Sequence, residues 1–197
     1  MRVAARALVV ASALLAPFGQ GRAAEDEDRR AWFAPDHAKL QLAGAIGFLS
    51  PGVGYALLGR RVELDLFLGY APESLAGVDL WSVTGKASWL PWRVGLGRGW
   101  TARPLYAAVQ LTYTFGDRFF VFLPDRYGPE YYPLPTALRA GLALGAALGR
   151  PVGRLEHLGA YAEVVAVDLP LAYLVSNLGT VRASEVLSVA LGVRVEL

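Results

Sequence analysis

The sequence predicts an all-β protein, a closed antiparallel transmembrane β-barrel of eight strands. Apolar residues make up 54% of the chain, and most segments alternate apolar and polar side chains with the period of a strand. Two classes expose that much apolar surface, helical membrane proteins and membrane β-barrels. The one long uncharged run, Leu40–Gly59, contains Pro51 and five glycines, which would break a spanning helix. The barrel is therefore favoured over a single-span helix.

The N-terminus predicts a secretory signal peptide over residues 1–23. Basic residues precede an apolar run from Ala7 to Phe18, which is too short to span a bilayer as a helix. Small residues follow and place the cleavage after Ala23. Residues 24–38 are then an N-terminal spacer, and residues 39–197 form the outer-membrane β-barrel. An uncleaved N-terminal anchor is the competing interpretation.

Loss of the signal peptide changes the charge balance. The whole chain has 19 basic and 17 acidic residues. Three arginines and no acid leave with the signal, so 16 basic residues face 17 acidic ones and the net charge becomes −1. The sequence pI near 9.0 is therefore no indication of nucleic-acid binding, and no nucleic-acid partner is expected. With no cysteine, one methionine and two histidines, the chain is expected to hold no disulfide, metal or cofactor.

The first two predicted strands are Lys39–Phe48 and Val53–Leu58, joined by a turn at Leu49–Gly52. The count of eight strands depends on this turn around Pro51. One bent strand over residues 40–58 is the alternative. The strand count would then be seven, and a further strand would be sought in Leu169–Ser176.

Three further strands are predicted before the longest loop: Val62–Tyr70, Asp79–Leu90 and Pro104–Phe115. Each places apolar side chains on one face and small, polar or charged side chains on the other. Trp81 and Trp89 share the apolar face of the second of these strands. Eight residues at ~3.3 Å each span roughly 26 Å along the strand. For a tilted strand, the projection of this length on the membrane normal is close to the height of the apolar band between the aromatic girdles of a membrane barrel. Two core tryptophans of a soluble sheet are the alternative.

The last three predicted strands are Thr136–Leu148, His157–Val167 and Ser184–Leu197. The final strand alternates without a break from Leu187 onwards, with one wholly apolar face and one face of Ser, Ala, Gly, Arg and Glu. In a soluble β-sandwich the second face would carry many long charged side chains. A face of small residues with isolated charges suits the inside of a narrow barrel, and the apolar face then contacts lipid.

Eight strands place both chain ends on one side, taken as periplasmic, together with the connections at Gly59–Arg61, Pro91–Arg103 and Gly149–Glu156. The two longest connections, Gly116–Pro135 and Asp168–Ala183, then face outward, as in outer-membrane barrels.

Within the first of these outer connections, the segment Arg118–Pro135 contains three phenylalanines, three tyrosines and four prolines. Prolines restrict the backbone, and tyrosines suit the depth of lipid headgroups. A folded rim loop is expected, with binding of a ligand or glycolipid as the sharper alternative. Its candidate contact residues are Asp125, Arg126, Tyr127, Tyr131 and Tyr132.

Seven charged residues fall on the predicted inner face of the barrel, three of them basic and four acidic. They are Glu63, Asp65, Lys86, Arg139, Glu163, Arg194 and Glu196. Buried charge has to be paired, so a salt-bridged plug is expected, with a proton or ion path as the alternative. Because side chains fill the lumen of an eight-stranded barrel, a general porin is not expected.

The order of signal peptide, acidic spacer, alternating strands and strand-like C-terminus resembles the small eight-stranded outer-membrane β-barrels of Gram-negative bacteria. The resemblance is one of pattern over residues 40–197. It departs at Leu197, because such chains usually end in an aromatic residue, often phenylalanine. The resemblance implies residence in the outer membrane and contact with outer-membrane lipid. The leading hypothesis is a non-enzymatic barrel whose outer loops serve structural, lipid or partner contact, the partner being an external ligand or an envelope protein.

Some barrels of that class are lipid A deacylases, which use serine, histidine and an acid, with the histidine close to the serine in sequence. The candidates for such an acyl hydrolase here are His157, Ser176 and Glu163. His157 and Ser176 are 19 residues apart, and a nucleophile needs its base within hydrogen-bond reach. No catalytic residue is therefore assigned, and the hydrolase is kept as the alternative. His37, in the N-terminal segment, is expected to be solvated.

Overall fold

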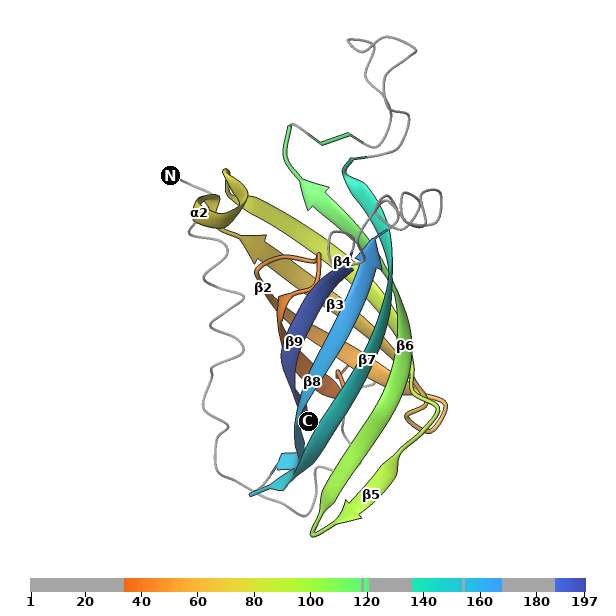
Figure 1. Cartoon of the computed structure of the whole chain (residues 1–197). Helices are drawn as coiled ribbons and strands as arrows, with labels where there is room; N and C mark the ends of the chain where they lie inside the picture. The colour runs from red at the N-terminus through yellow and green to blue at the C-terminus, as the bar shows by residue number, and fades with distance from the viewer. Residues whose placement is uncertain (1–33, 118, 121–135, 154, 168–186) are drawn as a thin grey trace. The chain divides into compact units, whose positions relative to one another are not determined.

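Eight antiparallel strands close into a barrel (Figure 1). The computed structural model describes residues 34–117, 119–120, 136–153, 155–167 and 187–197. The strands of the barrel are β1 (His37–Ala43), β2 (Leu49–Leu57), β3 (Val62–Ala71), β4 (Leu80–Trp89), β6 (Trp100–Phe115), β7 (Leu138–Val152), β8 (Leu155–Val167) and β9 (Leu187–Glu196). A short extra strand, β5 (Val94–Gly97), precedes β6, and a one-turn helix, α2 (Glu73–Ala76), lies between β3 and β4.

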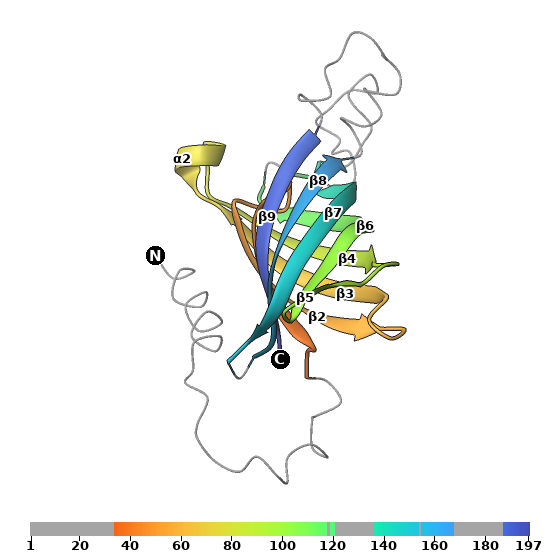
Figure 2. The ribbon, with the colours of Figure 1, turned by 60° about the horizontal axis from the view of Figure 1, so that its bottom comes forward.

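Each strand pairs with its neighbours in the sequence, and two further pairings close the ring. The first strand pairs with the last, with His37 opposite Glu196, and β4 pairs with β6. Figure 2 shows β7, β8 and β9 on the near side of the ring and β2, β3 and β4 behind them. The start of β1 and the end of β9 therefore lie at one end, together with the connections from β2 to β3, from β4 to β6 and from β7 to β8. We call this the turn end and the opposite end the loop end.

The eight predicted strands are confirmed, and the seven-strand alternative is wrong. The predicted turn at Leu49–Gly52 is also wrong, because these residues begin β2 and the turn lies at residues 44–48. Gly44 and Gly47 have positive φ angles in this turn, which glycine adopts easily, and Ala43 and Ala45 also have positive φ angles. Pro51 is accommodated within β2 because the pairing with β3 is interrupted there. It joins Leu49 to Tyr70 and resumes only at Gly52, so no hydrogen bond from the proline nitrogen is needed.

The predicted connection Pro91–Arg103 is wrong over most of its length. Residues 94–97 form β5, and β6 begins at Trp100, so the two make a hairpin that runs past the end of β4. Three glycines and Pro91 gave this stretch the composition of a loop. The predicted connection Gly149–Glu156 is likewise shorter in the structure, because β7 continues to Val152 and β8 starts at Leu155.

No helix in the described part of the chain has the length and apolar character needed to cross a membrane. The uncharged run Leu40–Gly59, weighed above as a spanning helix, forms β1, β2 and their turn instead.

The wall of the barrel is apolar outside and polar inside. Along β3, for example, Leu64 and Leu66 are exposed, while Glu63 and Asp65, which alternate with them, are buried. The same alternation holds on β9, where Leu191 and Val193 are exposed and Arg194 is buried. Soluble domains show the opposite distribution.

Aromatic rings fill much of the lumen, and glycines on the adjacent strands give them room. Tyr161 on β8 lies directly opposite Gly192 on β9, and a Cβ atom on Gly192 would lie 2.2 Å from the tyrosine ring. Tyr106 and Gly145 stand in the same relation, with 2.5 Å to the ring. The small inward-facing residues of the sequence are thus matched to large neighbours rather than lining an open channel.

At the loop end, the turn between β1 and β2 folds inward over the lumen. Ile46 at its centre is almost fully buried. Its carbonyl oxygen accepts a hydrogen bond from Ser82 Oγ at 2.5 Å, and the carbonyl of Gly44 accepts one from Gln110 Nε2 at 3.4 Å. The turn therefore covers the lumen above the polar side chains of β4 and β6.

Candidate functional site

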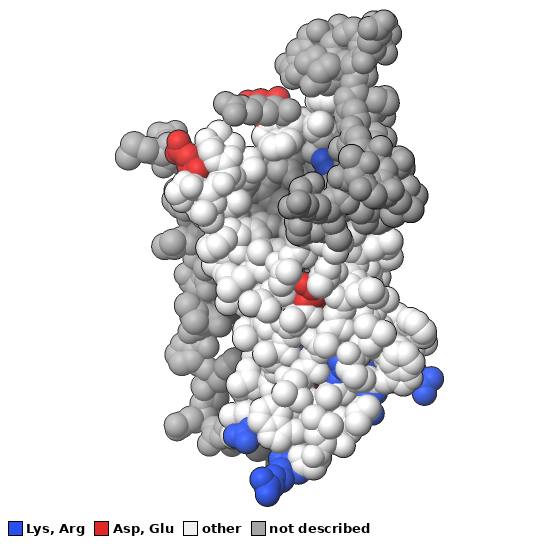
Figure 3. Space-filling model, in the orientation of Figure 1, with Lys and Arg blue, Asp and Glu red and all other residues white. Residues whose placement is uncertain are grey.

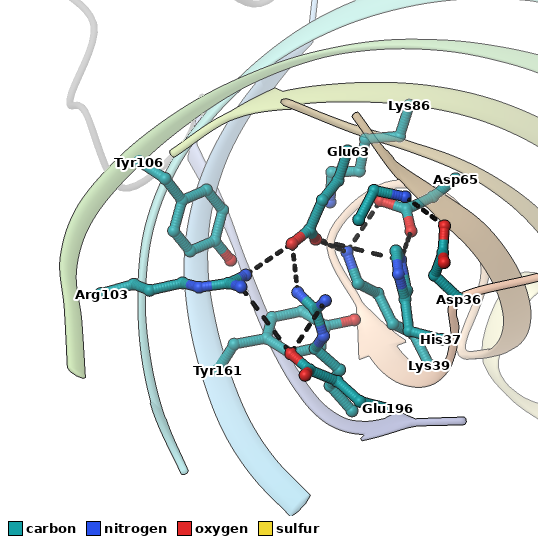
Figure 4. Close-up of polar contacts among 12 residues, drawn as sticks. Asp36, His37, Lys39, Glu63, Asp65, Lys86, Arg103, Tyr106, Tyr161 and Glu196 are labelled. Atoms are coloured by element: carbon teal, nitrogen blue, oxygen red, sulfur yellow. Dashed lines mark hydrogen bonds and ion pairs between the residues drawn. The ribbon is translucent and has the colours of Figure 1, made fainter. Parts of the chain in front are cut away.

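A buried network of charged side chains crosses the lumen near the turn end (Figure 4), with Glu63 at its centre. Glu63 Oε2 accepts a hydrogen bond from Lys39 Nζ at 2.9 Å. Its other oxygen accepts hydrogen bonds from Arg103 Nη1 at 2.5 Å and from Arg194. These three cations come from β1, β6 and β9, so one carboxylate links four strands around the barrel.

Asp65, two residues along β3, extends the network to the first strand. Its Oδ2 lies 2.8 Å from Lys39 Nζ, and its Oδ1 lies 2.6 Å from His37 Nε2. His37 is completely buried, so the expectation that it is solvated is wrong. The reason is that β1 begins two residues before the predicted Lys39 and gives His37 the first inward-facing position.

Glu196, at the end of β9, closes the network towards the turn end. It accepts a hydrogen bond from Arg60 Nη1. Arg194 Nη2 and Arg103 Nη2 lie 3.3 Å and 3.8 Å from its Oε1. Because Arg60 belongs to the turn between β2 and β3, this contact ties that turn to the last strand across the mouth of the lumen.

A second buried ion pair, between Lys86 on β4 and Glu163 on β8, lies deeper in the lumen. Tyr106 donates a hydrogen bond to Glu163 Oε1 at 2.9 Å. Lys86 and Tyr161 both donate to Gln41 Oε1, at 3.3 Å and 3.2 Å. These contacts join strands from opposite sides of the ring.

The structure places six of the seven predicted lumen residues among the buried side chains. Glu63, Asp65, Arg194 and Glu196 meet in the first network, and Lys86 meets Glu163 in the second. Arg139 is half-buried near the loop end, where it stands opposite Thr112.

Sequence reasoning missed two of the central cations of the network, Lys39 and Arg103. Lys39 alternates with Leu40 and Leu42, so the period of the strand could have placed it inside. Arg103 was assigned to the predicted connection Pro91–Arg103. The pairing of β6 with β7 shifts in register between Arg103 and Tyr106. Both side chains therefore face the lumen, although residues three apart on a regular strand would face opposite sides.

The candidate hydrolase residues are not brought together where the structure describes them. His157 and Glu163 both face inward on β8, but six residues at ~3.3 Å each separate them by roughly 20 Å, beyond hydrogen-bond reach. Glu163 is instead paired with Lys86. Ser176 lies outside the described residues.

The candidate loop contacts also lie outside the described residues. They are Asp125, Arg126, Tyr127, Tyr131 and Tyr132.

Three ligand atoms of the types that metals prefer do meet in the network. One from each of His37, Glu63 and Asp65 lies within 4.8 Å of the others. Lys39 Nζ, however, lies within 2.9 Å of a carboxylate oxygen of both acids, where it already supplies the positive charge. A divalent cation there would face the ammonium group across a short distance. The geometry therefore fits an ion-pair network better than a metal site.

The network leaves little open space. A cavity of ≈ 20 Å³ lies among Glu63, Arg103, Tyr106, Tyr161 and their neighbours, which is room for about one water molecule. The charges of this network are therefore paired and enclosed, with little open space between them.

Comparisons with protein-family models, with curated proteins and with solved structures find no match to this chain. The functional proposal therefore rests on the fold and on the geometry of the lumen.

Proposed function

We propose that this protein is an integral outer-membrane β-barrel with a filled lumen, which acts without enzymatic activity and presents outer loops for contact with lipid, a ligand or an envelope partner. The observation that carries this proposal is the apolar outer wall. A closed barrel satisfies its backbone hydrogen bonds internally, which is the condition for a β-structure to span lipid. An exposed apolar belt on such a barrel is the surface that lipid covers.

The length of the connections supports an orientation. At the turn end, residues 58–61 make a short turn, and β8 begins three residues after the end of β7 at Val152. At the loop end, 22 residues lie between Phe115 at the end of β6 and Leu138 at the start of β7. Outer-membrane barrels have short periplasmic turns and long outer loops. We therefore place the turn end in the periplasm and the loop end outside the cell.

Aromatic side chains lie at both ends of the apolar wall. Trp89 and Trp100 are exposed near the turn end, and Trp81, Tyr113 and Phe115 are exposed near the loop end. Tyr70 packs against Trp81 with ring centroids 4.7 Å apart. Two aromatic belts at the edges of an apolar wall are the arrangement that stabilises a barrel at the two membrane interfaces.

Membrane fractionation together with a heat-modifiable gel-shift assay tests this proposal. We expect the mature protein in the outer-membrane fraction, cleaved after Ala23, and a compact band that shifts only after boiling. Recovery of folded protein as a soluble periplasmic species would refute membrane residence.

The contact role of the loop Arg118–Pro135 has its own test. Replacing Tyr127, Tyr131 and Tyr132 with alanine should leave the gel shift intact and weaken association with envelope lipid or with a surface partner. Lipid A mass spectra of cells with the intact, His157→Ala and deleted gene should be identical. Loss of an acyl chain that requires His157 would replace the non-enzymatic proposal by the acyl hydrolase.

A further inference from the structure

The β5–β6 hairpin, residues 92–100, extends the apolar outer wall beyond the closed ring at the turn end (Figure 1). Val94 pairs with Ala102, which pairs in turn with the outward-facing Leu148, so Val94 continues the outer face. Leu96 is 60% exposed and Trp92 is 53% exposed. Such a group of apolar side chains on a projecting hairpin needs a partner.

Exposed arginines surround this hairpin. Arg98 forms its tip, between two glycines with positive φ angles. Arg150 on the next strand places its guanidinium 5.4 Å from the ring centre of Trp100, so the aromatic face holds the cation on the outer side of the wall. Tryptophan and arginine side by side suit the boundary between acyl chains and charged headgroups.

Exposed basic side chains gather at the turn end of the barrel (Figure 3). Among the side chains whose burial the structure describes, the exposed basic ones all lie at the turn end, and the exposed acidic ones all lie at the loop end. The first set is Arg61, Arg93, Arg98 and Arg150, and the second is Glu73, Asp79 and Asp117. Among the described residues, the exposed positive charge is therefore concentrated at the turn end.

The backbone of the hairpin limits how deep it can lie. β5 is the terminal strand in the sheet order and pairs only with β6 among the described strands. Its outer edge leaves backbone groups that hydrocarbon cannot satisfy. The hairpin can therefore reach the headgroup layer, where water and phosphate oxygens accept hydrogen bonds, but not the acyl core.

We propose that the β5–β6 hairpin is a binding surface for anionic phospholipid headgroups in the leaflet that meets the turn end. Trp92, Val94 and Leu96 enter the interface, and Arg98 and Arg150 bind the lipid phosphates, for which guanidinium geometry is suited. This inference rests on the proposed membrane function and adds the lipid class and the residues that select it.

The test reconstitutes the full mature chain in nanodiscs of phosphatidylcholine mixed with phosphatidylglycerol and measures retained lipids by native mass spectrometry. The intact protein should retain phosphatidylglycerol above its share of the mixture. The variants Arg98→Gln and Arg150→Gln should each lower that preference about fivefold at low salt. Glu73→Gln, an exposed change at the loop end, is the matched control and should leave the preference unchanged.

The outcomes separate the two proposals. Failure of the intact protein to enter the nanodiscs would contradict the membrane function itself. Entry without a preference for phosphatidylglycerol, or a preference that survives both arginine substitutions in a folded barrel, would overturn only the headgroup site. Since the chain has no cysteine, Leu96→Cys tests a second copy as the occupant of the hairpin, and disulfide-linked dimers in vesicles would also overturn the inference.

Discussion

The inner and outer walls of this barrel are built from the same strands, yet they differ in their side chains. The inner wall carries polar and charged side chains that pair with one another, and the outer wall carries apolar side chains. On β3, Glu63 is almost fully buried, and its carboxylate contacts three cations from three other strands. Its neighbour Leu64 is exposed on the outer wall. Neighbouring residues of one strand therefore belong to two different surfaces. The inner surface is a network of charges paired in fixed directions, and the outer surface is apolar.

This difference governs how each wall responds to change. If the outer wall faces lipid, as proposed, it tolerates changes in side-chain shape but not in polarity, because lipid adapts to side chains but not to charge. The inner wall is strict in both respects, because an unpaired buried charge is costly and because each aromatic ring has a fitted space.

The largest expected effect comes from removing the centre of the charge network. Glu63→Gln keeps the size of the side chain but leaves Lys39, Arg103 and Arg194 with too little negative charge. We expect a loss of about 3–5 kcal/mol in the free energy of unfolding, measured by urea titration in vesicles. Glu73→Gln at the exposed α2 is the control. A loss below about 1 kcal/mol for Glu63→Gln would mean that the network does not brace the barrel.

A charge on the outer wall should have a smaller but still large effect. Leu191 on β9 is 56% exposed, and arginine near the bilayer midplane costs ~2–4 kcal/mol. Leu191→Arg should therefore reduce folding in vesicles, whereas Leu191→Phe should not. Equal folding of the two variants would show that this face does not contact lipid.

The fit of the aromatic rings in the lumen can be tested without any change of charge. A Cβ atom at Gly192 would lie 2.2 Å from the ring of Tyr161, so Gly192→Val forces the ring away from Gln41. We expect a destabilisation of ~1–3 kcal/mol from overpacking, by the same urea titration. In the double variant with Tyr161→Ala the strain should be relieved, and additive losses would contradict the proposed contact.

The smallest effect is expected when the second ion pair is replaced as a whole. Lys86→Met alone leaves Glu163 buried without its cation and should cost several kcal/mol, as at Glu63. Adding Glu163→Gln removes that charge while its side-chain oxygen still accepts from Tyr106. The double variant should lie within about 1 kcal/mol of the natural protein. A double variant as unstable as Lys86→Met would show that the charges themselves, rather than their mutual pairing, are needed.

Much of this architecture was accessible from local patterns. The alternation from Leu187 to Leu197 predicted β9 and both of its faces, and the same reasoning placed Glu63 and Asp65 inside. β5 was not accessible, because Pro91 and its glycines have the composition of a loop, and only the pairing of Val94 with Ala102 makes the segment a strand. The turn between β1 and β2 was misplaced for a related reason, since Pro51 was read as part of the turn.

The sequence by itself determined the inward face of most regular strands, because side chains alternate with a period of two along a strand. It did not determine the orientation of Arg103, which depends on the irregular pairing of β6 with β7. It could not determine which of the inward-facing side chains meet. Arg194 and Glu63 are 131 residues apart, and Lys86 and Glu163 are 77 residues apart, so their contacts depend on how the strands close into a ring. Only the tertiary structure therefore decided that the inward charges form a braced network, because ring closure sets which side chains share the narrow lumen.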